Sequence, residues 1–134
     1  DLFGGTGQLG IEALSRGAKH CVFVDAGEPA CRLIRENLKR AKMEKDALVI
    51  RGDYLDYLSK CRENFDIVFL DPPYAEVFLE NALKKLTEID ILQTGAIIVA
   101  ERPADKELSV EIPGFIRSKD YKYGKILLTI YRKA

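Results

Sequence analysis

Apolar positions along most of the chain follow two alternating patterns. Short apolar and β-branched runs, which are typical of strands, cover residues 20–25, 47–51, 65–70 and 95–101. Between them, apolar residues recur with the period of a helix over residues 8–17, 28–41, 54–58 and 75–86. Residues 1–3 have the character of a strand end that leads into glycines. This alternation predicts an α/β fold with a mostly parallel, Rossmann-like sheet and right-handed crossovers.

The last part of the chain has a different pattern. Residues 115–121 and 125–131 are strand-like runs around Lys122-Tyr123-Gly124, which predicts an antiparallel hairpin at the C-terminal edge of the sheet. No internal repeat, low-complexity tract or linker interrupts the 134 residues. A length of this order suits one compact domain, so we expect residues 1–134 to form a single domain.

Composition and charge narrow the class of protein. The 21 basic and 21 acidic residues cancel, which argues against a uniformly basic nucleic-acid binder. The apolar runs are too short to cross a bilayer, and no basic-then-apolar secretory leader is visible. Cys21, Cys31 and Cys61 have no zinc-ligand spacing, which favours reduced thiols in a cytoplasmic protein without a bound metal.

Acidic residues follow successive predicted strands. They stand at or just beyond the carboxyl ends of these strands: Asp1, Asp25, Asp53, Asp71 and Glu101. Taken singly they have ordinary explanations, since Asp53 can cap the helix after it and Asp25 can lie in a solvated turn. The carboxyl edge of an open α/β sheet is where ligands bind. Acids repeated along that edge predict a ligand that is cationic or rich in hydroxyl and amine groups.

Glycines at positions 5, 7 and 10 match the spacing of a dinucleotide-binding loop, and Asp25 lies near the position of its ribose-binding acid. An NAD-dependent oxidoreductase is therefore one alternative. Asp1 argues against it, because a carboxylate beside the loop repels the pyrophosphate that a helix N-terminus holds. The same carboxylate attracts an ammonium or sulfonium group. S-adenosylmethionine carries both cations and a ribose diol, so the loop favours this cofactor.

The segment Asp71-Pro72-Pro73-Tyr74 directly follows the apolar run of residues 65–70. Its prolines fix φ and lack N–H groups, so the loop offers acceptors, namely the Asp71 carboxylate and backbone carbonyls. Tyr74 adds an aromatic face on which a base can stack. Such a site suits the exocyclic amine of a nucleobase, whose hydrogens it can hold while the nitrogen lone pair points at a methyl donor. A proline-stiffened turn that only links strand to helix is the alternative.

Several motifs together resemble those of the RsmD-type ribosomal RNA guanine-N2 methyltransferases. These motifs are DLFGGTGQLGIEALSRGA at the start, FVD, the acid in RGD, DPPY, and the closing YKYGKILLTIYRK. The resemblance extends over nearly the whole chain. It implies a Rossmann-like S-adenosylmethionine-dependent methyltransferase sheet. It also implies methyl transfer to the N2 amine of a guanine in small-subunit ribosomal RNA.

The resemblance further implies roles for individual residues. It implies that the cofactor is bound by Asp1, Phe3, Gly5, Gly7, Asp25, Asp53 and Tyr54. Of these, Asp25 takes the ribose hydroxyls, and Asp53 with Tyr54 meets the adenine. It implies that the target guanine is held by Asp71, Pro72 and Tyr74. The implied partners are S-adenosylmethionine and ribosomal RNA or the small ribosomal subunit, with no metal and no membrane. The methylated nucleotide and the oligomeric state stay open.

The chain departs from the family at its start. Family members carry a basic stretch before the glycine loop, whereas this sequence begins at Asp1 of the motif. We therefore expect a fragment of a longer protein, with its first strand truncated and its RNA-gripping N-terminal segment missing. Two alternatives follow. One is an amino-methyltransferase that acts on adenine or cytosine in DNA, and the other is a cofactor-binding fragment without activity.

The zero net charge hides an uneven distribution. Residues 61–116 hold 11 acids against 5 bases, whereas residues 117–134 hold 6 bases against 1 acid. A second basic cluster, residues 32–45, holds 6 bases and 2 acids. A solvated helix face is the favoured explanation for residues 32–45. For the C-terminal hairpin, an RNA-facing edge and a solvated face are equally good hypotheses.

Overall fold

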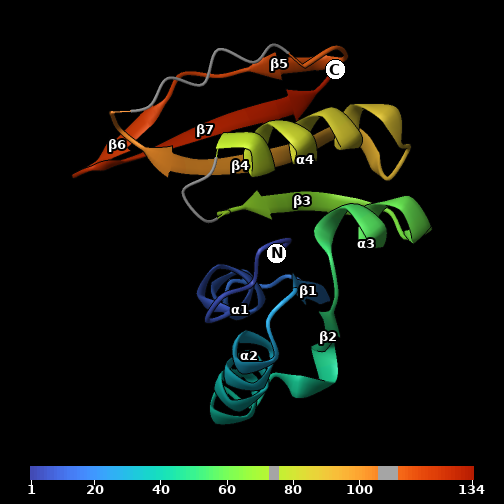
Figure 1. Ribbon diagram of the computed structural model, residues 1–134, viewed down its shortest axis with the longest axis vertical. Helices are drawn as coiled ribbons and strands as arrows, with labels where there is room; N and C mark the ends of the chain where they lie inside the picture. The colour runs from blue at the N-terminus through green and yellow to red at the C-terminus, as the bar shows by residue number, and fades with distance from the viewer. Residues whose placement is uncertain (73–75, 106–111) are drawn as a thin grey trace. The chain divides into compact units, whose positions relative to one another are not determined.

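The computed structural model describes residues 1–72, 76–105 and 112–134. These residues divide into two compact units, Asp1–Tyr57 and Leu58–Ala134, and the boundary falls inside the helix α3 (Tyr54–Lys60). Figure 1 labels the helices and strands of both units. The prediction of a single domain over residues 1–134 stays a prediction.

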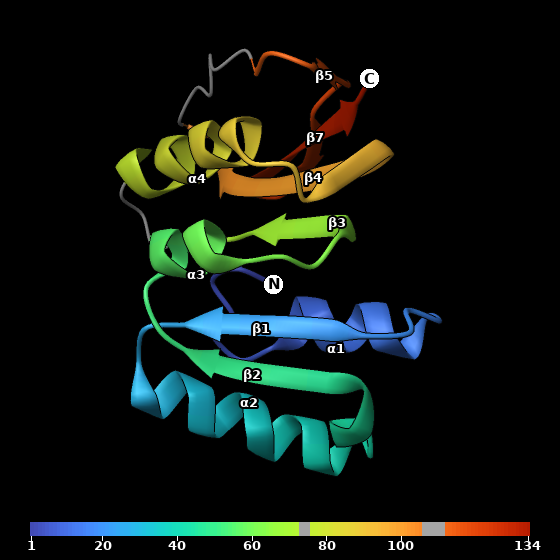
Figure 2. The same ribbon diagram turned by 90° about the vertical axis from the view of Figure 1, so that its right-hand side faces the viewer.

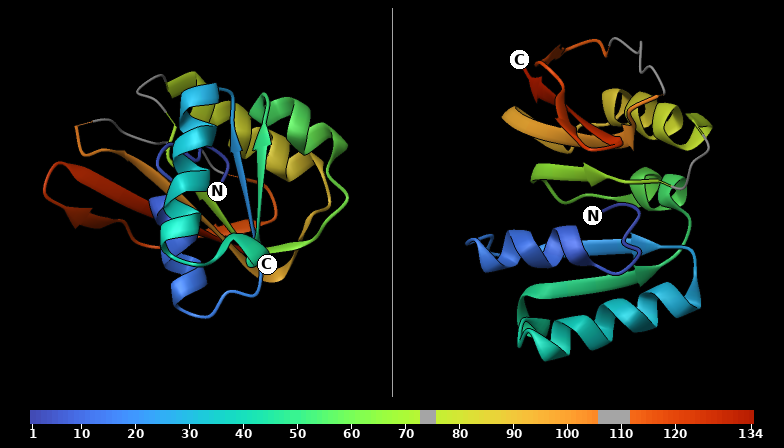
Figure 3. Two further views of the ribbon diagram at one scale, coloured as in Figure 1. Left: turned by 90° about the horizontal axis from the view of Figure 1, so that it is seen from below. Right: turned by 90° about the vertical axis from the view of Figure 1, so that its left-hand side faces the viewer.

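The first unit is built from two parallel strands and their helices. Its elements are α1 (Gln8–Ser15), β1 (Cys21–Asp25), α2 (Glu28–Arg40), the short 3₁₀ helix η1 (Glu44–Asp46) and β2 (Ala47–Arg51). The strands β1 and β2 point in the same direction, in a register that places Cys21 beside Ala47, and α2 lies alongside them (Figures 2 and 3). As predicted, α1 ends just before Gly17, whose φ of 111° suits a residue without a side chain.

The start of the chain continues this parallel arrangement. The Asp1 nitrogen donates a hydrogen bond to the Val22 carbonyl (3.0 Å), and the Val24 N–H donates to the Asp1 carbonyl (2.9 Å). This is the hydrogen-bond pattern of a strand parallel to β1. Asp1 therefore lies at the end of a strand-like segment, as the sequence predicts.

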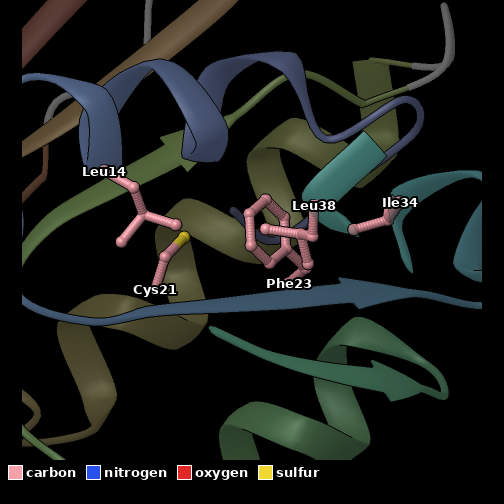
Figure 4. Packing of buried hydrophobic residues seen from close by; sticks show 5 residues of the cluster. All are labelled: Leu14, Cys21, Phe23, Ile34 and Leu38. Atoms are coloured by element: carbon pink, nitrogen blue, oxygen red, sulfur yellow. The ribbon is translucent and has the colours of Figure 1, made fainter. Parts of the chain in front are cut away.

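The hydrophobic core of the first unit lies between β1 and its helices. It consists of Leu14 from α1, Cys21 and Phe23 from β1, and Ile34 and Leu38 from α2 (Figure 4). The β1 side chains alternate in direction, so Cys21 and Phe23 share one face of the strand. Figure 4 shows that face turned toward α1 and α2.

The second unit combines one parallel strand pair with an antiparallel group. Its elements are β3 (Phe65–Leu70), α4 (Glu76–Glu88), β4 (Leu92–Pro103), β5 (Phe115–Arg117), β6 (Tyr121–Tyr123) and β7 (Ile126–Lys133). The strand order is β3-β4-β7-β5, with β3 parallel to β4 and β7 antiparallel to β4. The short strands β5 and β6 pair with opposite halves of β7 (Figure 1). The C-terminus lies beside β5, where the Ala134 N–H donates to the Gly114 carbonyl (2.9 Å).

The predicted fold class is confirmed, and three details differ from the sequence predictions. The predicted strand 115–121 is interrupted: β5 ends at Arg117, and β6 covers Tyr121–Tyr123, so Lys122 and Tyr123 of the predicted turn belong to a strand. The strand β4 begins at Leu92 rather than Gly95 and is irregular opposite β3. The nearly unbroken apolar run of residues 65–70 predicts a strand covered on both faces, but Ile67 is 43% exposed. Ala75, the predicted start of α4, lies outside the described residues.

Two further observations concern cysteines and membranes. Cys21, Cys31 and Cys61 are all free thiols, and the first two are buried. Among the described residues, no helix is long and apolar enough to cross a membrane.

Candidate cofactor and amine-binding sites

The glycine loop connects the strand-like start of the chain to α1. The Gly4 N–H donates to the Val24 carbonyl (2.9 Å), which fixes the loop to the end of β1. Gly5 and Gly7 have φ angles of 57° and 80°, in the left-handed region that favours glycine. Gly7 is also the N-cap residue of α1 and makes no side-chain cap. The first N–H groups of α1 therefore need acceptors from elsewhere.

Asp1 supplies one of those acceptors. Its Oδ2 atom accepts a hydrogen bond from the Gly10 N–H (3.2 Å) in the first turn of α1. Its Oδ1 atom is buried and has no hydrogen-bond partner among the described residues. A buried carboxylate oxygen is costly unless a donor or a cation reaches it. The position beside this oxygen therefore suits a positively charged group.

The hydrogen bond between the Gly10 N–H and Asp1 also distinguishes between two classes of cofactor. A helix N-terminus holds a pyrophosphate through its free N–H groups and positive dipole end. Here the Asp1 carboxylate already occupies the first turn of α1 and contributes a negative charge. These residues fit the ammonium or sulfonium of S-adenosylmethionine, and they do not fit a dinucleotide pyrophosphate.

Asp25 holds two parts of the backbone together at the end of β1. Its Oδ2 atom accepts from the Gly5 N–H (3.0 Å), and its Oδ1 atom accepts from the Gly27 N–H (2.9 Å). The residue is half-buried, and each carboxylate oxygen can accept more than one hydrogen bond. Asp25 therefore shapes the glycine loop and keeps acceptor capacity for a diol.

Asn37 contacts the glycine loop, and we did not predict this contact from the sequence. It lies on α2 at a position of the otherwise apolar helical period, and its Nδ2 atom donates to the Thr6 carbonyl (2.8 Å). The signal for this contact in the sequence was a polar residue at a position where the helical period of α2 is otherwise apolar. The bond fixes the middle of the glycine loop to α2.

Gly4 and Gly10 lie in closely packed positions, and Gly10 is the more constrained because its neighbours are the Phe23 ring and Cys21 Sγ. A Cβ atom on Gly10 would lie 2.3 Å from Phe23 Cε1, and one on Gly4 would lie 2.6 Å from Ile34 Cδ1. Real Cβ atoms essentially never make contacts this short. The third glycine of the motif thus lets α1 approach β1.

The aromatic residues Phe3 and Tyr54 contact each other in the first unit. Their ring centroids lie 4.8 Å apart with an interplanar angle of 44°. Tyr54 is only 7% exposed, whereas Phe3 is half-buried and keeps part of its surface accessible. Tyr54 is therefore placed to support Phe3, which can offer an apolar surface to a planar ring.

Asp53 has the ordinary role that its sequence position allows. Its Oδ2 atom accepts hydrogen bonds from the N–H groups of Leu55 (3.0 Å) and Asp56 (3.1 Å). This is a helix N-cap at the start of α3. The residue is exposed, so the cap does not prevent an additional contact with a ligand.

Asp71 and Glu101 form a carboxyl pair in the second unit. The β3–β4 register places Leu70 beside Ala100, and both of these side chains are fully buried. The next residues on the two strands, Asp71 and Glu101, therefore lie side by side on the opposite face. Their side chains hydrogen-bond to each other.

This pairing changes the acidity of both groups. Burial raises the pKa of Asp71, and the hydrogen bond from Glu101 opposes part of that rise. Burial, the negative charge of Asp71 and the hydrogen bond to it all raise the pKa of Glu101. A hydrogen bond between two carboxyl groups requires a shared proton, and the raised pKa of both groups makes that proton easier to retain. The sequence predicted Asp71 as a site residue but left the role of Glu101 open.

The predicted site residues fall into two sets, one in each unit. The first unit brings together the glycine loop with Asp1, Phe3, Asp25 and Tyr54, and Asp53 follows the end of β2. The second unit holds Asp71 and Pro72 at the end of β3. The predicted stacking residue Tyr74 lies outside the described residues. No cluster of three or more potential metal ligands occurs in the part of the chain that the structure describes.

Comparisons with known proteins agree with the class that these features define, an α/β methyltransferase fold. Residues 1–132 match the model of the family described as "Conserved hypothetical protein 95". The chain belongs to this family, and the resemblance to RsmD-type methyltransferases is confirmed.

Individual relatives share much of the sequence. The chain is 39% identical to YlbH from Bacillus subtilis over 99% of this chain and 74% of YlbH. It is 38% identical to ribosomal RNA small subunit methyltransferase D from Haemophilus influenzae over 81% of this chain and 58% of that protein. A solved structure of a conserved hypothetical protein from Streptococcus pyogenes has a TM-score of 0.93 and 30% identity, and it covers 100% of this chain and 84% of that chain.

Proposed function

We propose that this protein transfers a methyl group from S-adenosylmethionine to the exocyclic N2 amine of a guanine in small-subunit ribosomal RNA. The observation that carries the proposal is Asp71, a carboxylate at the end of a parallel strand, followed by Pro72 and hydrogen-bonded to Glu101. Family membership supports it, because relatives in Haemophilus influenzae and Escherichia coli are named as small-subunit ribosomal RNA methyltransferases. The proposal includes a single domain, because the family model spans both units. It also includes a cytoplasmic location.

Residues of the first unit bind the cofactor in this proposal. S-adenosylmethionine supplies an electrophilic methyl group on a sulfonium centre. The buried Oδ1 atom of Asp1 receives the ammonium group, and Asp25 accepts hydrogen bonds from the ribose hydroxyls. The apolar surface of Phe3, supported by Tyr54, contacts the adenine. Gly5 and Gly7 let the backbone approach the cofactor without side chains in the way.

Residues of the second unit hold the target amine. Asp71 accepts a hydrogen bond from the N2 amine, directs its lone pair toward the methyl donor and receives the proton that the alkylated nitrogen loses. Orientation of two reactants can contribute about 7–11 kcal/mol to a rate enhancement. Pro72 fixes the backbone beside Asp71, and Tyr74 is proposed to stack on the base. The base must be reachable, so the target guanine is unpaired or flipped out.

A methyl-transfer assay tests the function. The protein is incubated with S-adenosylmethionine carrying a labelled methyl group and with ribosomal RNA, small ribosomal subunits or plasmid DNA. We expect label in small-subunit RNA, recovered as N2-methylguanosine after digestion. Label in DNA alone, on adenine or cytosine, would overturn the assignment to RNA.

The 134-residue chain and a full-length relative should be assayed side by side, because the chain spans only 58–74% of the two relatives described above. Cofactor binding by both, with transfer by the longer protein alone, would identify this chain as a cofactor-binding module. Transfer by both would show that this chain carries the complete chemistry.

A further inference from the structure

The hairpin formed by β6 and β7 exposes aromatic and apolar side chains on one face. Tyr121 and Tyr123 are two residues apart, so they share a face of β6. In the register of the hairpin, Tyr123 lies opposite Ile126 and Tyr121 opposite Leu128, which places these β7 residues on the same face. Tyr123 is 64% exposed, Ile126 41% and Tyr121 37%.

The opposite face of β7 explains why this one is accessible. Thr129 and Tyr131 alternate with the exposed residues along the strand and are both fully buried. The core therefore covers the face that carries Thr129 and Tyr131. The face that carries the tyrosines of β6 points away from that core.

Two lysines border the exposed tyrosines. Lys119 Nζ lies 5.4 Å from the centroid of the Tyr121 ring, and Lys125 lies beside Gly124 in the turn between β6 and β7. Both are exposed, and neither forms an ion pair within the described part of the chain. Lys122 pairs with Leu127 and points to the opposite face of β6. We refer to Lys119, Tyr121, Tyr123 and Lys125 as the tyrosine–lysine surface.

The nearby acid does not neutralise this surface. Asp120 is the only acid in residues 117–134, and its carboxylate accepts hydrogen bonds from Arg102 (3.0 Å), Arg117 (3.3 Å) and Thr129 (2.8 Å). Its charge is therefore matched by two guanidinium groups. The register also places Glu101 opposite Leu128, on the face of the tyrosines, and its carboxyl group hydrogen-bonds to Asp71. The charges of Lys119 and Lys125 therefore remain for a partner outside the chain.

We propose that the tyrosine–lysine surface binds a single-stranded segment of RNA, with bases stacked on the tyrosines and phosphates contacted by the lysines. Flat aromatic rings with cations beside them suit single-stranded nucleic acids, whose bases stack and whose phosphates are negatively charged. An acidic protein segment would satisfy the lysines but leave the exposed rings without a planar partner. The proposal rests on the proposed function only for the identity of the nucleic acid.

Fluorescence anisotropy with a short labelled single-stranded RNA tests the surface, using the intact chain. Tyr123→Ala should weaken binding roughly tenfold, the loss expected for one stacked base, and Tyr123→Phe should bind within about twofold of the native chain. The double variant Lys119→Gln, Lys125→Gln should lower the magnitude of the slope of log affinity against log salt by about 1.4. The matched control Arg32→Gln, Lys39→Gln removes as many exposed charges from α2 and should change affinity far less.

Native-like RNA binding by both hairpin variants would overturn the proposal, and so would an equal loss in the α2 control. Polyglutamate that displaces the RNA as effectively as unlabelled RNA would instead assign the surface to an acidic protein. The methyl-transfer assay separates this inference from the proposed function. If the protein methylates RNA but the hairpin variants bind RNA as the native chain does, the surface is rejected and the proposed reaction stands. If the hairpin variants lose RNA binding but the native chain does not methylate RNA, the proposed reaction is rejected and the surface stands.

Discussion

The side chains of Asp71 and Glu101 hydrogen-bond to each other where Asp71 follows β3 and Glu101 lies beside it on the parallel strand β4. Two carboxyl groups in contact need a proton between them or a cation beside them, since two negative charges at this distance repel. The fully buried neighbours Leu70 and Ala100 fix this contact, because they set the direction in which the next side chains point. Asp71 is therefore held by its neighbour before any substrate binds.

Replacement of Asp71 should remove methyl transfer and leave the fold intact. Asp71→Ala eliminates the acceptor for the target amine, so we expect the turnover rate to fall about 10²–10⁴-fold, the range for a positioned acid–base group. Asp71 lies just past the carboxyl end of β3 and is not one of the buried core residues, so the melting temperature should change little. Single-turnover kinetics and calorimetric measurement of cofactor affinity check this. Asp66→Ala, which removes another exposed acid from β3, is the control and should keep native rates. An Asp71→Ala variant with native turnover would contradict the assigned role.

Replacement of Glu101 should stabilise the protein above acidic pH. The pKa of Glu101 is raised in the folded state, so its ionisation is unfavourable to folding above that pKa, and the penalty is absent below the unfolded value of about 4.3. Glu101→Gln keeps a donor for Asp71 and removes the repulsion. We expect its free energy of unfolding at neutral pH to exceed the native value by a few tenths of a kcal/mol to about 1 kcal/mol. Urea titrations at pH 7 and pH 4 measure the difference, which should vanish at pH 4.

Replacement of Asp120 should have the opposite pH dependence. Burial raises the pKa of Asp120, but hydrogen bonds from Thr129 and Arg117 and the charges of Arg117 and Arg102 outweigh burial, so the net shift is downward. Its stabilisation is complete above the unfolded value of about 3.9 and is lost as pH falls through the folded-state pKa.

Asp120→Asn should therefore cost roughly 1–3 kcal/mol at pH 7, because it weakens charge-assisted hydrogen bonds to a nearly buried arginine. The cost should be smaller at pH 3, because the pH has then fallen below the unfolded value of about 3.9. Asp90→Asn is the control for urea unfolding at both pH values. Its carboxylate is 98% exposed beside Lys133, and such a pair contributes little. Equal costs for the two variants would show that the Asp120 contacts do not stabilise the hairpin.

Most elements could be predicted from the sequence because their signals are local. The β3 run and the period of α2 each follow from side-chain hydrophobicity, and both elements occur where predicted. The separation of β5 from β6, which ends at Tyr123, depends on which half of β7 each strand pairs with. That choice is made by tertiary contacts, which no local pattern contains.

The candidate site shows the same division. Spacing alone indicated the glycine loop, Asp25 and Asp71, because the chemistry of a βα turn requires these residue types. The Glu101 contact follows from the register of β3 against β4, and the Asn37 contact follows from the packing of α2. Register and packing are properties of the folded chain, so the roles of Glu101 and Asn37 could not be predicted from the sequence.

Asp25 should affect cofactor binding more than chemistry. Asp25→Ala removes the acceptor for the Gly5 and Gly27 N–H groups and, in the proposed function, for the ribose hydroxyls. Loss of hydrogen bonds to a charged acceptor costs about 1.5–3 kcal/mol each, so we expect the dissociation constant of S-adenosylmethionine to rise at least tenfold. Calorimetric titration measures it, with Asp46→Ala, an exposed acid of η1, as the control. Unchanged cofactor affinity in Asp25→Ala would remove Asp25 from the cofactor site.

Gly10 should tolerate no side chain, although it lies outside the proposed contacts with ligands. In Gly10→Ala the new Cβ would lie 2.3 Å from Phe23 Cε1 and 2.8 Å from Cys21 Sγ, both in the core between α1 and β1. Overpacking of a core costs typically 1–3 kcal/mol, so the variant should unfold at a clearly lower urea concentration. Gly52→Ala is the matched control, because its Cβ would meet nothing within 4 Å. Equal stability of Gly10→Ala and Gly52→Ala would mean that α1 can move away from β1 without cost, and the third glycine would then need another explanation.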